Sequence, residues 1–83
     1  MDNDICIKLG KRIRVCREKL NLSQKELATK VRISVSTLGK IEKGKTNPPL
    51  FTIYKIAKVL KIRLTKLFQW FLWEEVILLY KRL

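Results

Sequence analysis

The sequence lacks histidine, and its 83 residues contain only two cysteines, three glycines and two prolines. Cys6 and Cys16 have no second pair to complete a zinc set, and without histidine the commonest general acid–base is missing. The few, scattered glycines form no phosphate-binding loop, and no cluster of acidic residues is present. We therefore expect no metal site, no cofactor, no small-molecule ligand and no enzymatic activity.

Acidic residues are also scarce, with seven Asp and Glu against 19 Lys and Arg, which gives a formal net charge of +12. The excess is spread along the chain, because residues 1–50 and residues 51–83 both carry a surplus of basic groups. A small domain this basic is expected to bind a polyanion, with nucleic acid as the first choice and an anionic membrane surface as the second.

The chain shows no strand-like alternation of apolar and polar residues, and its first residues contain no continuous apolar stretch. The first absence predicts a single all-α domain, and the second argues against a secretory signal. We expect both thiols to be small core side chains that stay reduced in a reducing compartment. We expect a cytoplasmic protein.

Apolar residues recur at helical spacing in several segments. In the first segment the expected buried stripe is formed by Ile5, Leu9, Ile13, Cys16 and Leu20. The expected helices cover residues 5–20, 24–31, 35–43 and about 50–60, and a fifth runs from residue 64 or 65 to the end.

Short polar signals mark where these helices begin and end. Ser23 and Glu26 have the spacing of a capping box, and Ser34 is the next N-cap candidate. Asn21 and Gly44 stand where helices end, since both residue types tolerate left-handed backbone. Helices 24–31 and 35–43, joined by a three-residue turn, form a helix-turn-helix over residues 23–43 by spacing alone.

The same region resembles a known family. LSQKELA, the run SVSTLGKIEKG from Ser34 and the Asn47-Pro48 pair that follows are similar to the lambda-repressor and Cro type of helix-turn-helix domain, the XRE family. The resemblance covers residues 9–68 and implies a five-helix lambda-repressor-like fold, with the DNA-binding domain at residues 5–68. Arg32 and Lys61 depart from the pattern, because glycine is usual at both places, and Gly39 stands inside the recognition helix.

The resemblance also implies roles for individual residues. The helix from Val35 would lie in the major groove and read base edges. Arg17 and Glu42 would form a structural salt bridge between the first and third helices. The expected base-reading residues are Ser34, Val35, Ser36 and Lys40, and the expected phosphate contacts are Gln24, Thr37, Lys43, Lys45 and Asn47.

Residues 69–83 form a separate hydrophobic extension whose apolar side chains point nearly all round a helical wheel. Such a helix must be covered on more than one side. We prefer a homodimer interface, to which Trp70, Phe71, Trp73, Ile77 and Leu78 would contribute. A cap on the monomer core and an interfacial membrane anchor are the alternatives, although the stretch is too short to span a bilayer.

Together these features predict a sequence-specific regulator of transcription that binds double-stranded DNA. It would act as a homodimer on a palindromic operator, in the manner of phage repressors or of the controllers of restriction-modification systems. The alternative is an antitoxin-like interaction module whose C-terminal helix binds a different protein. A third hypothesis is non-specific binding to RNA or membrane, which would be indifferent to DNA sequence.

Overall fold

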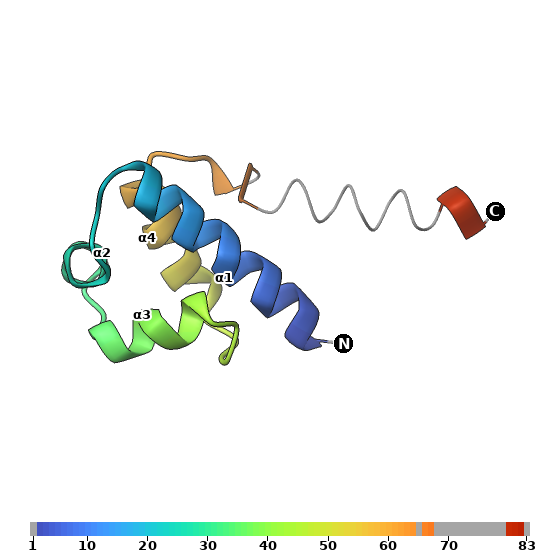
Figure 1. The fold of residues 1–83 in the computed structure, drawn as a ribbon, viewed down its shortest axis with the longest axis horizontal. Helices are drawn as coiled ribbons and strands as arrows, with labels where there is room; N and C mark the ends of the chain where they lie inside the picture. Colours follow the sequence, from blue (N-terminus) through green and yellow to red (C-terminus); the bar gives the residue numbers. More distant parts are fainter. Residues whose placement is uncertain (1, 65, 68–79, 83) are drawn as a thin grey trace.

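The computed structural model describes residues 2–64, 66–67 and 80–82, and within these ranges the chain contains helices and no strand (Figure 1). Residues 64, 66–67 and 80–82 are also helical, but most of the predicted fifth helix lies outside the described residues. The all-α fold class is confirmed. The four full helices are α1 (Asp2–Lys19), α2 (Gln24–Val31), α3 (Val35–Glu42) and α4 (Leu50–Val59).

Side chains cap the starts of α2 and α3, as the sequence predicted. Ser23 Oγ accepts a hydrogen bond from the Glu26 N–H at 3.0 Å, and Glu26 Oε1 accepts one from the Ser23 N–H at 2.9 Å. The Ser23 backbone N–H, and then its hydroxyl, lowers the pKa of the Glu26 carboxyl, because both stabilise the carboxylate. Ser34 Oγ likewise accepts from the Thr37 N–H at 3.0 Å. These bonds satisfy amides that the first turn leaves unpaired.

Each of the four helices ends in the same backbone arrangement, in which one residue turns left-handed and two backbone hydrogen bonds close the last turn. The left-handed residues are Asn21 (φ 57°), Arg32 (φ 65°), Gly44 (φ 72°) and Lys61 (φ 60°). After α3, for example, the Gly44 N–H donates to Ile41 O and the Lys45 N–H to Lys40 O. Arg32 and Lys61 therefore adopt the backbone that glycine adopts most easily, at a cost of about 1 kcal/mol each.

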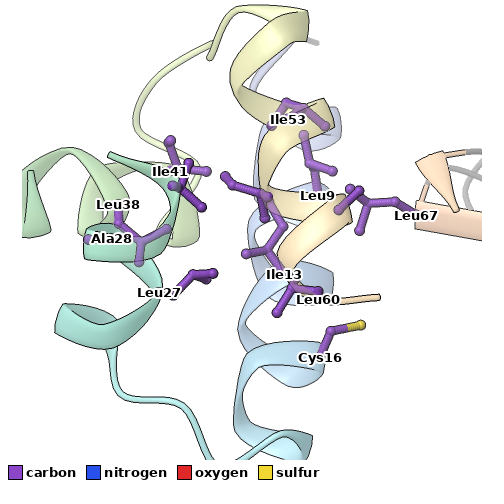
Figure 2. Packing of buried hydrophobic residues seen from close by; sticks show 13 residues of the cluster. Leu9, Ile13, Cys16, Leu27, Ala28, Leu38, Ile41, Ile53, Leu60 and Leu67 are labelled. Atoms are coloured by element: carbon purple, nitrogen blue, oxygen red, sulfur yellow. The ribbon is translucent and has the colours of Figure 1, made fainter. Parts of the chain in front are cut away.

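The core lies where all four helices meet, and Figure 2 shows its side chains converging from each of them. Ile13, Leu27, Leu38, Ile56 and Leu67 are completely buried. The other buried members are Leu9, Cys16, Ala28, Val31, Ile41, Ile53, Ala57 and Leu60.

Two members of the predicted stripe on α1 are not in this core. Ile5 is 47% exposed and Leu20 is 42% exposed, so the prediction that both are buried was wrong. Ile5 lies one turn before Leu9, where the core begins, and Leu20 follows the end of α1, where the chain turns at Asn21. Cys6 is only half-buried, whereas Cys16 is buried, and both thiols are free.

Gly10 allows α1 and α3 to cross closely. A Cβ at this position would lie 2.5 Å from the Glu42 carbonyl oxygen and would also overlap the Ile41 carbonyl oxygen. Real Cβ atoms do not approach backbone oxygens so closely, so the crossing requires glycine. This contact sets where the end of α3 lies on α1.

Candidate nucleic-acid interface

Helix α3 has one buried face and one exposed face. Leu38 and Ile41 are buried in the core, whereas Val35 is 43% exposed and Ser36 and Lys40 are exposed. The spacing of the two buried residues is that of a single helical face. The side chains predicted to read base edges therefore lie together on the outer surface of α3.

The side chains of Ser34 and Thr37 form a hydrogen bond at the start of α3. Their hydroxyl oxygens lie 2.7 Å apart, and Ser34 Oγ also accepts from the Thr37 N–H. Ser34 is thus first an N-cap, with its hydroxyl already bonded inside the chain. Any contact from Ser34 to a base would use its remaining hydrogen-bonding capacity.

Arg17 and Glu42 form a buried ion pair between the end of α1 and the end of α3. Arg17 Nε donates to Glu42 Oε2 at 2.7 Å, and Arg17 Nη2 donates to Glu42 Oε1 at 3.1 Å. The remaining Nη1 donates to Leu22 O at 2.8 Å. The hydrogen bonds to Glu42 raise the pKa of the Arg17 guanidinium, and burial opposes them only in part. The pair is bidentate, which adds geometric specificity to its charge.

Gln24 joins this pair from the first turn of α2. Its Nε2 donates to Glu42 Oε1 at 2.9 Å, so one carboxylate holds α1, α2 and α3 together. Nothing in the sequence indicated this bond, because Gln24 and Glu42 are 18 residues apart. Gln24 Nε2 carries a second N–H that these bonds do not use and that can still donate.

A hollow of about 300 Å³ opens beside the ion pair and is lined by Arg14, Arg17, Gln24, Glu42 and Lys43. It brings together two of the predicted phosphate contacts, Gln24 and Lys43. Arg14 was not among the predicted site residues, although it precedes Arg17 by three positions and therefore shares its face of α1. Its Nε lies 3.4 Å from Glu18 in an exposed pair.

The remaining predicted phosphate contacts follow α3 along the chain. Lys43 caps the end of the helix, and Lys45 and Asn47 lie in the loop before Pro48 and Pro49. All three side chains are exposed. The predicted interface residues thus lie on the first turn of α2, on α3 and on the loop after it. Trp70, Phe71, Trp73, Ile77 and Leu78 lie outside the described residues.

Two kinds of feature are absent from the described residues. No group of three or more potential metal ligands occurs in this part of the chain. No helix within the same ranges is long and apolar enough to cross a membrane.

The profile of the helix-turn-helix family HTH_3 matches residues 13–67, about two thirds of the chain. The chain belongs to this helix-turn-helix family. This match confirms the XRE-type resemblance. Members of this family are DNA-binding regulators of transcription and not enzymes.

Three similar proteins illustrate the family. An HTH-type transcriptional regulator of Archaeoglobus fulgidus is 47% identical over 57 residues, covering 69% of this chain and 81% of that protein. The control protein C.MunI of a Mycoplasma species is 37% identical over 67 residues, covering 80% and 90%. The crystal structure of the restriction-modification controller protein C.AhdI of Aeromonas hydrophila superposes with a TM-score of 0.74 at 37% identity, covering 78% of this chain and 97% of that one.

Proposed function

We propose that this helix-turn-helix protein is a sequence-specific regulator that binds a palindromic operator as a homodimer in the cytoplasm. The observation that carries the proposal is the exposed face of α3, on which Val35, Ser36 and Lys40 lie free of the core. A helix with this placement fits the major groove of duplex DNA.

The side chains on this face suit direct reading of bases. Lys40 can donate to guanine O6 and N7, Ser36 can donate or accept, and Val35 offers an apolar surface to a thymine methyl. Ser34, already committed to capping α3, has the smallest part in this readout.

Phosphate contacts would come from the rim of the hollow beside the ion pair and from the loop after α3. Gln24, Lys43, Lys45 and Asn47 contribute donors there, and Arg14 adds a further cation on α1. Thr37 is the weakest of the predicted phosphate contacts, because its hydroxyl bonds to Ser34. These groups would set the register of the protein on the duplex, while α3 reads the sequence.

A homodimer is supported by apolar surface that the described core does not use. Leu50 is 67% exposed and Phe51 is 68% exposed, both at the start of α4. The sequence adds the strongly apolar extension at residues 69–83, with Trp70 and Trp73 as candidate anchors. Two domains related by a two-fold axis would read half-sites about one helical turn apart. The similarity to the restriction-modification controller protein C.AhdI, and to the control protein C.MunI, favours a controller of that type.

The proposal is tested by in vitro selection from a random duplex library at about 150 mM salt, where non-specific electrostatic attraction is weakened. We expect an enriched palindrome, whose half-site spacing then reports the dimer geometry. A folded protein that enriches no sequence would overturn the proposal. If such a protein also stays monomeric until a partner protein is added, the antitoxin-like alternative replaces it.

The variants Lys40→Ala and Lys45→Ala distinguish base recognition from non-specific phosphate binding. Lys40→Ala should relax discrimination at one or two base positions. Lys45→Ala should weaken binding to all sequences alike and reduce the salt slope by about 1. Binding is measured on the selected operator and on single-base variants over a range of salt. An equal loss of specificity in both variants would contradict the assigned roles.

A further inference from the structure

We propose that the protein carries a second DNA-binding surface, remote from α3, which holds the phosphates of a separate duplex segment. This distal basic surface is formed by Lys30, Lys55, Lys58, Lys61, Arg63 and Lys66. The proposal goes beyond the operator-binding function and rests on it only in the choice of duplex DNA as the polyanion.

The first observation is the uniform sign of the charge. From Lys43 to Trp73 the sequence contains no acidic residue and seven basic ones. Among the described residues, none of the six cations of the distal basic surface forms an ion pair. Glu26 interacts electrostatically with Lys30, and no described ion pair neutralises the other five cations.

The second observation is the shape of the surface. One hollow of about 240 Å³ is lined by Lys30, Lys55, Lys58 and Val59. A second, of about 480 Å³, follows directly along the chain and is lined by Lys61, Ile62, Arg63 and Lys66. Both hollows are edged by cationic side chains, as a groove that follows a phosphate backbone requires.

Two of the cations are also held in position along α4. The Lys55 ammonium lies 5.2 Å from the centre of the Phe51 ring, and that of Lys58 lies 5.7 Å from the centre of the Tyr54 ring. Cations within about 6 Å of an aromatic face are attracted to it. These contacts limit the side-chain entropy that binding would otherwise remove.

The part of the distal basic surface that follows α4 does not share one straight duplex with α3. In Figure 1, α3 lies along the lower edge of the molecule and the segment after α4 lies along its upper edge, with α1 running between them. DNA is stiff over many helical turns, so a duplex lying against α3 leaves this part of the distal basic surface open. The occupant is therefore a second segment.

Duplex DNA fits this surface better than an acidic protein does. It carries one charge per about 1.7 Å of axis, and its condensed counterions are released when lysines replace them. Such binding needs closely spaced positive charges and no hydrogen-bonding groups placed for particular bases. The distal basic surface offers such charges. The second segment would allow the protein to pass directly from one duplex to another.

The test is the dissociation of the full-length protein from a short fluorescent duplex, followed by stopped flow after addition of unlabelled duplex at several concentrations. With a second surface, the dissociation rate rises with competitor concentration. In the variant Lys58→Gln/Arg63→Gln/Lys66→Gln this dependence should be lost, and the salt slope of non-specific binding should fall by about 0.9 for each phosphate contact removed. All three side chains are exposed, so the fold should persist.

The matched control is Lys11→Gln/Lys19→Gln/Lys25→Gln, which removes three exposed charges that line neither hollow. This control should keep the competitor dependence. A native rate that does not change with competitor, or a dependence that survives in the distal variant, would overturn the inference. Equal acceleration by polyglutamate at the same charge concentration would also overturn it in favour of an acidic protein. Operator selection by the distal variant should remain intact, so failure here is distinguishable from failure of the proposed function.

Discussion

Removing the Glu42 carboxylate should be among the most damaging single changes in this domain. Its side chain is only 2% exposed, and that of its partner Arg17 is 10% exposed. Glu42→Ala would leave the Arg17 guanidinium buried without its counter-charge and would release the Gln24 amide. Breaking a buried pair from one side costs about 3 to 5 kcal/mol.

The lower end of that range applies here, because the adjoining hollow gives water access to Arg17. A loss of about 3 kcal/mol in a domain of this size lowers the melting temperature by about 12 to 24 °C. Thermal unfolding followed by circular dichroism measures the shift. The control is Glu18→Ala, which breaks the exposed pair with Arg14 and should cost no more than about 1 kcal/mol.

A double-mutant cycle identifies the origin of the loss. Arg17→Met/Glu42→Ala removes both charges, so it should be clearly less destabilised than the sum of its two single variants. If Glu42→Ala lowers the melting temperature no more than Glu18→Ala does, the reasoning from burial is wrong. Additive effects in the cycle would show that the two side chains do not act as a pair.

Three further changes test other parts of the fold. Gly39→Ala should stabilise the protein by up to about 1 kcal/mol in denaturant unfolding. Alanine is the better helix former, and its Cβ would meet no atom within 4 Å. A loss of stability would show that the new methyl group meets a contact that the structure does not contain. Gly10→Ala should lower the denaturant midpoint strongly, since its Cβ would overlap backbone at the crossing of α1 and α3, and an unchanged midpoint would argue against that crossing. The lowered pKa of Glu26 means that its carboxylate stabilises the fold at neutral pH, and that this contribution is lost as the pH falls through the folded-state pKa. Because the Ser23 backbone N–H is the larger cause, Ser23→Ala should keep part of the lowering in an NMR titration of Glu26; a full return to the ordinary value would refute this order of causes.

The local features of the fold were predictable from the sequence. The capping box at Ser23 and Glu26 depends on residues three apart, and the bounds of α2 follow from it. The left-handed stop at Asn21 follows from its position at the end of an apolar stripe, and those at Arg32 and Lys61 lie where the family resemblance places glycine. In each case the signal and the structure lie within a few residues of one another.

Features that depend on distant contacts could not be read in this way. Helical periodicity indicates which face of α1 is apolar, but not where the core beneath it stops, so Ile5 and Leu20 were wrongly placed inside it. In the sequence Gly10 looks like an ordinary helix position, and only its contact with α3 shows why glycine is required there. Arg14 joins the hollow only because α1 and α3 converge there. Among the site residues, the pattern predicted which side chains are on α3, but not that Gln24 bonds to Glu42.

The bonds from Arg17 and Gln24 to Glu42, and from Arg17 to Leu22, have a kinetic consequence. They connect α1, α2 and α3 in the free protein, so the exposed face of α3 does not have to fold when it meets DNA. Association should then be limited by encounter and steered by the +12 charge, and it should slow as salt screens that attraction. For such a regulator, the delay between synthesis and action would be set by how quickly its concentration rises in the cell and not by rearrangement of the protein.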